Sequence, residues 1–207
     1  MKQTVFSTDR LKALSDGVFA IAMTLLVLEL KLPAELDDAS GAFTAALVAQ
    51  IPHFVSWILS FAILCRLWIV SHGLLSTGTT RSRRFMTWNL VFLGAIAFIP
   101  FPTALVSEHY DQALSIFIFS ATYAVAGLAL AGMAVAYRRE LETARAASES
   151  RNVARAVIII LATALISCSL ALFRPWLGLL IWGIYLFASM LVVPARDPDK
   201  SPAGDDG

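Results

Sequence analysis

The feature that most constrains this chain is an apolar run near its amino terminus, residues 10–32, long enough to cross a membrane as one helix. From Val18 to Leu28 only Thr24 interrupts the apolar residues. The first half of the run carries less apolar residues: Arg10, Ser15, Asp16 and Gly17. Because an ionisable group is costly against lipid, we expect this helix to turn its polar positions toward other helices or toward water.

Composition supports a membrane protein. The chain has 207 residues, of which 58% are hydrophobic and 15% are charged, whereas soluble domains have roughly 45–50% and about 25%. Its two cysteines, Cys65 and Cys168, lie in apolar runs and are interpreted as buried small side chains. The sequence has no CxxC, HExxH, glycine-rich phosphate loop or nucleophile elbow. We therefore predict no enzyme activity, no catalytic residue, no cofactor and no nucleic-acid partner.

Apolar runs, prolines and charged stretches predict an all-α integral membrane protein with six transmembrane helices and one repeat per chain. The six-helix transmembrane domain is residues 1–194, with spans at about 11–32, 52–72, 85–106, 113–137, 156–173 and 176–193. Residues 34–41 form an acidic loop, 43–51 an approach segment, 138–155 a charged helical extension, and 195–207 a polar, disordered tail. Two prolines in residues 99–103 should bend or end the third span.

The distribution of charge predicts the orientation. An even number of spans places both termini on one side, and lysine and arginine concentrate in the terminal segments and in the 2–3 and 4–5 linkers. The other three loops contain only Lys31 and Arg174. By the positive-inside rule both termini are cytoplasmic. Four tryptophans near span ends suggest an interfacial belt: Trp68, Trp88, Trp176 and Trp182. Small residues in the fourth span suggest close helix contact: Ala124, Gly127, Ala131 and Gly132.

The first span carries an apolar stripe with helical spacing. Ile21, Leu25 and Leu28 share one face, which Leu14 and Val18 extend toward the amino terminus. From spacing alone, packing or lipid contact is the favoured interpretation of such a stripe. The alternative is a hydrophobic constriction. Each subunit contributes one apolar side chain to a ring, and such rings gate a pore by dewetting it.

Asp16 needs a partner outside its own helix, because Arg10 is six residues away and on a different face. The second span returns to the same membrane side and brings Trp68 and His72 near its end. We therefore expect a polar cluster of Arg10, Ser15, Asp16, Trp68 and His72. A structural link between the two spans is favoured over a proton relay, and one histidine with one aspartate is too few ligands for a metal site.

The first span also resembles the opening helix of the transmembrane protein 175 family. The match consists of Arg10, Leu14, Ser15 and Asp16, followed by G-V-F-A-I-A-M-T-L-L-V-L-E over residues 17–29. A W-x-x-H-H element of the family corresponds to Trp68, Ser71 and His72, and a P-F-P-T-like element to residues 100–103. Leu14 replaces the usual Phe, which keeps an apolar side chain, and Ser71 replaces a His, which removes one imidazole.

This resemblance implies a function. A prokaryotic single-repeat member would be a homotetrameric, passive potassium channel in the plasma membrane, without a TVGYG-type filter, and with its first helices lining the pore. Ile21, Leu25 and Leu28 would then form the constriction, and Thr24 would contribute to ion preference. The cluster of Arg10, Ser15, Asp16, Trp68 and His72 would hold the first helix in place.

Other functions remain open at the level of sequence. A proton- or ion-coupled transporter of a small solute would use a polar site near the middle of the membrane, for which Asn89 and the break at residues 99–103 are candidates. An intramembrane enzyme is disfavoured because His53, His72 and His109 are scattered. An assembly subunit without transport activity is the weakest alternative.

Overall fold

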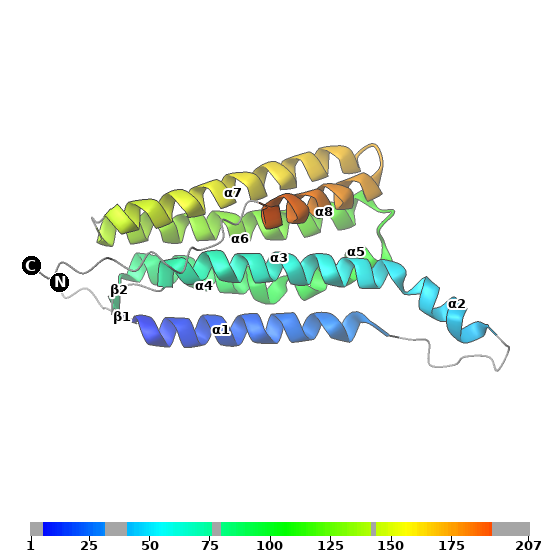
Figure 1. Ribbon diagram of the computed structural model, residues 1–207, viewed down its shortest axis with the longest axis horizontal. Helices are drawn as coiled ribbons and strands as arrows, with labels where there is room; N and C mark the ends of the chain where they lie inside the picture. Colours follow the sequence, from blue (N-terminus) through cyan, green and yellow to red (C-terminus); the bar gives the residue numbers. More distant parts are fainter. Residues whose placement is uncertain (1–5, 32–40, 76–79, 142–143, 192–207) are drawn as a thin grey trace, which may run out of the picture.

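The computed structural model describes residues 6–31, 41–75, 80–141 and 144–191. Within them, long helices lie side by side in an elongated bundle (Figure 1). The helices are α1 (Thr8–Leu25), the 3₁₀ helix η1 (Leu26–Glu29), α2 (Ala42–Ala49), α3 (Ile51–Leu75), α4 (Arg83–Phe98), α5 (Pro100–Glu108), α6 (Ala113–Glu140), α7 (Ala144–Ala171) and α8 (Pro175–Leu191). Two short strands, β1 (Phe6–Ser7) and β2 (Thr80–Arg81), pair antiparallel beside the start of α1. The fold is therefore the all-α membrane architecture that the sequence predicts.

Among the residues that the structure describes, five segments are long and apolar enough to cross a membrane: Thr8–Glu29, Ile51–Leu75, Arg83–Glu108, Ala113–Glu140 and Ala146–Ala171. Helix α8 is equally apolar but has only 17 residues, about 25 Å at 1.5 Å per residue. A bilayer core is about 30 Å thick. Six complete crossings therefore stay a prediction, with α8 as the sixth candidate.

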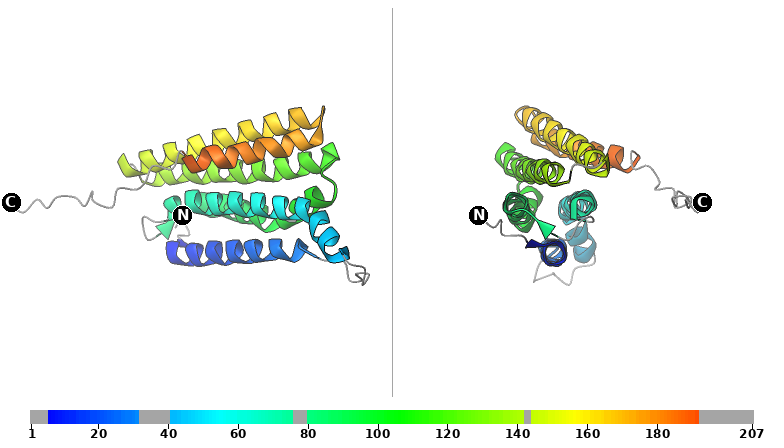
Figure 2. Two further views of the ribbon diagram at one scale, coloured as in Figure 1. Left: turned by 45° about the vertical axis from the view of Figure 1, so that its right-hand side comes forward. Right: turned by 90° about the vertical axis from the view of Figure 1, so that its left-hand side faces the viewer.

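The bundle has two sides. Seen nearly along the helices, α1 lies at one edge, α3 and α4 come next, and α6 and α7 lie on the far side (Figure 2). Helix α6 packs tightly on both of its neighbours. A Cβ atom added to Gly127 would approach Ile160 of α7 to 3.3 Å, and one added to Gly132 would overlap the indole of Trp88 on α4. Close helix contact at these two glycines confirms that prediction for the fourth span.

The proline-rich segment interrupts the third span by a single residue. Helix α4 ends at Phe98 and α5 begins at Pro100. The Thr103 amide donates to the Ile99 carbonyl at 3.2 Å, and the Thr103 hydroxyl donates to the same oxygen at 2.9 Å. Because the Ile99 carbonyl, which lies between α4 and α5, accepts both hydrogen bonds, the chain continues across the break as a helix.

The segment between the fourth and fifth spans is helical over most of its length, since α6 reaches Glu140 and α7 begins at Ala144, well before the predicted span start at residue 156. Helix α2 occupies the predicted approach segment. Most of the acidic loop and the whole tail at 195–207 lie outside the described residues.

The interfacial interpretation of Trp182 is wrong. This indole is fully buried and donates through Nε1 to the Ser120 hydroxyl at 3.1 Å. Ser120 in turn lies 3.2 Å from the Ser167 hydroxyl, which donates to the Gly178 carbonyl at 2.9 Å. A buried indole needs a partner for its N–H, and these serines provide it inside the α6–α8 bundle.

Candidate functional site

Helix α1 presents one buried and one exposed face. Its buried side includes Leu11, Phe19 and Ala22 and continues with Leu26 of η1, and the Phe19 ring lies 5.9 Å from the Phe92 ring of α4. The opposite face carries the predicted stripe: Ile21 is 61% exposed, Leu25 41% and Leu28 59%, with Leu14 at 43%. Within one chain the stripe therefore faces away from the bundle. It is available to lipid, to a pore or to another subunit.

Thr24 lies on the exposed side of α1. Its hydroxyl is within hydrogen-bonding distance of the Ala20 carbonyl at 3.0 Å and of the Ile21 carbonyl at 2.9 Å. A threonine hydroxyl has one hydrogen and two lone pairs. Because its helix backbone accepts the hydrogen, the side chain offers oxygen lone pairs outward, and these are ligands that a cation prefers.

The predicted link between the first two spans is present. Trp68 of α3 donates through Nε1 to Asp16 Oδ1 of α1 at 2.9 Å. The Trp68 ring also lies 5.5 Å from the His72 ring one turn further along α3. Asp16, Trp68 and His72 are thus brought together as expected. The arrangement ties α1 to α3 through one charge-assisted hydrogen bond.

The other two members of the predicted cluster are not joined to it. Arg10 is exposed and makes no ion pair or hydrogen bond with any residue that the structure describes. Ser15 is buried, and its hydroxyl has no hydrogen-bond partner among the described residues. Ser71 is also buried and donates to the Trp68 carbonyl at 3.0 Å. The position where the family motif has a histidine therefore faces the core rather than the Asp16 contact.

Asn89 of α4 is fully buried, and neither polar atom of its side chain has a hydrogen-bond partner within the described part of the chain. It is one of the two sequence features that keep the transporter interpretation open. In the described ranges, no group of three or more His, Cys, Asp or Glu side chains is placed to hold a metal ion.

The sequence did not identify Arg81 as special, because it appeared as one of a cluster of basic linker residues. The structure buries it to 2% exposure, with its guanidinium carbon 5.2 Å from the ring centres of Phe85 and Tyr137. Its Nη2 donates to the Leu74 carbonyl at 2.8 Å. Burial lowers the pKa of the Arg81 guanidinium from its ordinary value, while the Glu140 carboxylate acts to raise it.

Glu140 also binds Ser82, the residue after Arg81. One of its carboxylate oxygens accepts a short hydrogen bond from the Ser82 hydroxyl and a second bond, at 3.3 Å, from the Ser82 amide. Together with the β1–β2 pair, in which Phe6 lies opposite Arg81, these contacts connect the start of α1, the start of α4 and the end of α6. A possible signal in the sequence was the aromatic Phe85 four residues after Arg81; Tyr137 is too distant along the chain to have given one.

Comparison with known proteins finds a family similar to the first part of the chain. Residues 10–100 match the model of a family described as the endosomal/lysosomal potassium channel TMEM175. Over these 91 residues the chain is similar to the TMEM175 family. All the predicted site residues of the TMEM175 motif lie within the matched range, which runs from α1 to the first residue of α5.

Individual proteins are similar to this chain over about half of its length. A protein of Chamaesiphon minutus named as a potassium channel is 38% identical over 102 residues, which cover 49% of this chain and 50% of the relative. One from Streptomyces collinus with the same kind of name is 35% identical over 124 residues, covering 60% and 59%. The human protein, named as an endosomal/lysosomal proton channel, is 35% identical over 99 residues, or 44% of this chain and 20% of its own length. The chain thus covers half to three fifths of the two bacterial relatives.

Solved structures extend the likeness of the TMEM175 fold beyond the matched sequence. The crystal structure of a lysosomal potassium-selective channel TMEM175 homologue from Chamaesiphon minutus has a TM-score of 0.75 at 24% identity, covering 89% of this chain and 96% of that one. A variant of the potassium channel MtTMEM175, bound to a nanobody fusion, has a TM-score of 0.57 at 17% identity, covering 89% and 88%. These likenesses show that α6–α8 share the fold as well.

Proposed function

We propose that the protein is a passive potassium channel in which four copies of the chain place α1 around a central pore. The observation that carries the proposal is the continuous exposed face of α1, which holds Ile21, Leu25 and Leu28 while its other face is buried. The matched range of the potassium-channel family model, residues 10–100, includes this helix. In the proposed assembly each of the three side chains contributes to an apolar ring.

The chemistry of such a pore follows from the residues that line it. An apolar ring has no oxygen to replace the water around an ion, so a passing cation keeps much of its hydration and a narrow ring closes by dewetting. Thr24 supplies outward lone pairs on the same side of the helix. In this proposal potassium preference depends on that oxygen and is modest, since the sequence has no TVGYG-type filter.

The remaining parts of the proposal concern support and orientation. The bond from Trp68 to Asp16, with His72 beside it, holds α1 on α3. The channel domain comprises residues 1–194, with a tail at 195–207. Both termini lie in the cytoplasm of a prokaryotic cell, and Glu29 at the opposite end of the pore raises the local concentration of cations.

The test is ion flux into liposomes that contain the purified protein, driven in turn by potassium and sodium gradients. The variant Leu25→Ala widens the ring and should raise sodium flux more than potassium flux. Leu90→Ala is a matched control, because Leu90 is 50% exposed on α4, away from the proposed pore. The proposal is wrong if Leu25→Ala behaves like Leu90→Ala. It is also wrong if neither the native chain nor Ile21→Ala/Leu25→Ala conducts while circular dichroism shows both folded.

A second candidate is a proton- or ion-coupled transporter of a small solute. Buried, unpartnered Asn89 and the break between α4 and α5 favour it, because such transporters place polar groups beside interrupted helices. The transporter would be supported over the channel by a flux that saturates with solute concentration, is lost when Asn89 is substituted and is unchanged in Leu25→Ala.

A further inference from the structure

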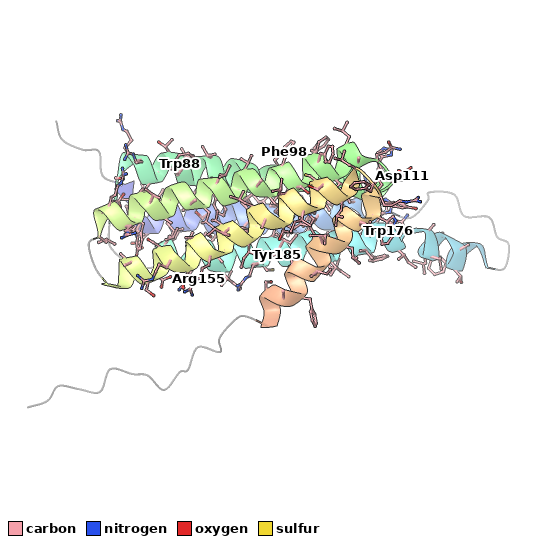
Figure 3. All side chains as sticks on the ribbon, turned by 90° about the horizontal axis from the view of Figure 1, so that it is seen from above. Trp88, Phe98, Asp111, Arg155, Trp176 and Tyr185 are labelled. Carbon is pink, nitrogen blue, oxygen red and sulfur yellow. The ribbon has the colours of Figure 1, made fainter. Side chains whose placement is uncertain are left out.

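An apolar groove of about 500 Å³ runs between α3 and α8. Val55 and Leu59 of α3 form one wall, and Trp176, Leu180, Gly183 and Phe187 of α8 form the other. Helix α8 runs obliquely away from α7 from the end where Trp176 is labelled (Figure 3). The groove has the size of a small-molecule site, and its lining offers almost no hydrogen-bonding group.

The length of the groove matches one leaflet of a bilayer. Trp176 and Phe187 line it and are eleven residues apart on α8, which corresponds to about 16 Å at 1.5 Å per residue. Half of a hydrocarbon core is about 15 Å. Trp176 lies in the first turn of α8, where an indole at the membrane surface is expected. A groove of this length that begins at the membrane surface would end near the middle of the bilayer.

A cation lies in the chain immediately before this end of the groove. Arg174 connects α7 to α8 and is exposed, and its guanidinium has no ion pair or hydrogen bond with a side chain in the described ranges. Its neighbours Leu172 and Phe173 are 71% and 80% exposed. Exposed apolar side chains beside Arg174 are expected to contact lipid. A guanidinium near the membrane surface can bind the oxygens of a lipid phosphate with two parallel hydrogen bonds.

We propose that the groove is a binding site for one phospholipid from the leaflet on the Arg174 side. Its acyl chain lies between α3 and α8, and its phosphate binds Arg174. An acyl chain satisfies an apolar groove that is one leaflet deep, whereas water would find no partners there. The ligand fills space that the protein leaves open, since a Cβ atom added to Gly183 would meet nothing within 4 Å. The proposal requires only that the chain spans a bilayer, and it is independent of ion conduction.

The experiment uses proteoliposomes containing a phospholipid with a photoreactive group midway along one acyl chain. After illumination, mass spectrometry of peptides locates the adducts. We expect them to concentrate on the groove faces of α3 and α8. Gly183→Leu fills the groove and should lower their yield about tenfold, while Arg174→Gln should lower it about threefold. Gly94→Leu is the matched control, because Gly94 is an exposed glycine on α4 with nothing within 4 Å of an added Cβ.

Two outcomes would overturn the site. Adducts spread evenly over all exposed apolar faces, with Gly183→Leu no different from Gly94→Leu, would mean ordinary surrounding lipid. An absence of groove adducts would also overturn it. If a Gly183→Cys variant then formed cross-links between chains, the occupant would be a second copy. Circular dichroism of both leucine variants separates a filled groove from a misfolded protein.

Discussion

The hydrogen bond from Trp68 to Asp16 can be measured as a coupling energy between α1 and α3. The perturbation is a double-mutant cycle of Asp16→Ala, Trp68→Phe and the double variant. Phenylalanine keeps an aromatic ring beside His72, so the single change removes mainly the N–H donor. The cycle then isolates the bond from the packing of each side chain alone.

The magnitude follows from the geometry of the bond. Its Nε1–Oδ1 distance is 2.9 Å, which is ideal for an N–H donor, and a charged acceptor places it in a class of about 1.5–3 kcal/mol. Trp68 is 39% exposed, and polar pairs between membrane helices average only about 0.6 kcal/mol. We therefore expect a coupling of about 1 kcal/mol, or about a fivefold change in the unfolding equilibrium constant.

The assay is denaturant unfolding of the purified protein in mixed micelles, followed by circular dichroism because tryptophan fluorescence changes with the variant itself. Trp88→Phe, combined with Asp16→Ala, is the control cycle: Trp88 is 38% exposed and packs against Gly132 of α6. Its coupling should be near zero. A Trp68 coupling below about 0.3 kcal/mol, the usual error of such cycles, would refute the view that this bond holds α1.

Three further predictions concern single positions. Gly132→Val should lower the free energy of unfolding by at least about 2 kcal/mol, because its side chain would overlap the Trp88 indole, whereas Gly94→Val should change it by less than about 0.5 kcal/mol; equal effects would contradict the close packing. Arg81→Met should cost about 1–3 kcal/mol in the same unfolding assay, since the Leu74 carbonyl loses its donor, and an unchanged stability would argue against that role. Thr24→Val should leave stability nearly unchanged, because within the described residues the hydroxyl bonds only to its own helix, but it should lower the potassium-to-sodium flux ratio by about twofold or more. An unaltered ratio would remove Thr24 from ion selection.

Local patterns in the sequence were sufficient to predict the contact between α1 and α3. Asp16 could not pair within its helix, and the second span returns to the same membrane side, so Trp68 and His72 were the available partners. Helical spacing likewise placed Ile21, Leu25 and Leu28 on one face. Spacing gives relative directions around a helix, but it does not say which direction faces the neighbouring helices. The exposure of that face required the structure.

Long-range contacts account for what the sequence missed. Arg81 appeared as a linker cation in the sequence, and its burial depends on Tyr137 at the far end of α6. Trp182 lies close enough to a span end to suggest the membrane surface, but hydropathy locates a side chain along the helix axis and not around it. Its burial depends on Ser120, which is 62 residues away in the chain. Arg10 was predicted to join the Asp16 cluster, and within one chain it does not.

The change from α1 to the 3₁₀ helix η1 alters how the proposed constriction is built. In an α-helix, Leu25 and Leu28 would point about 60° apart. In a 3₁₀ helix, side chains three residues apart are eclipsed and separated by about 6 Å along the axis, and the 3₁₀ segment begins at Leu26. Leu28 therefore lies almost directly above Leu25, and in the proposed tetramer the two leucines of each subunit would form one continuous apolar wall. The dry segment of the proposed pore would then be a short tube rather than a single narrow ring.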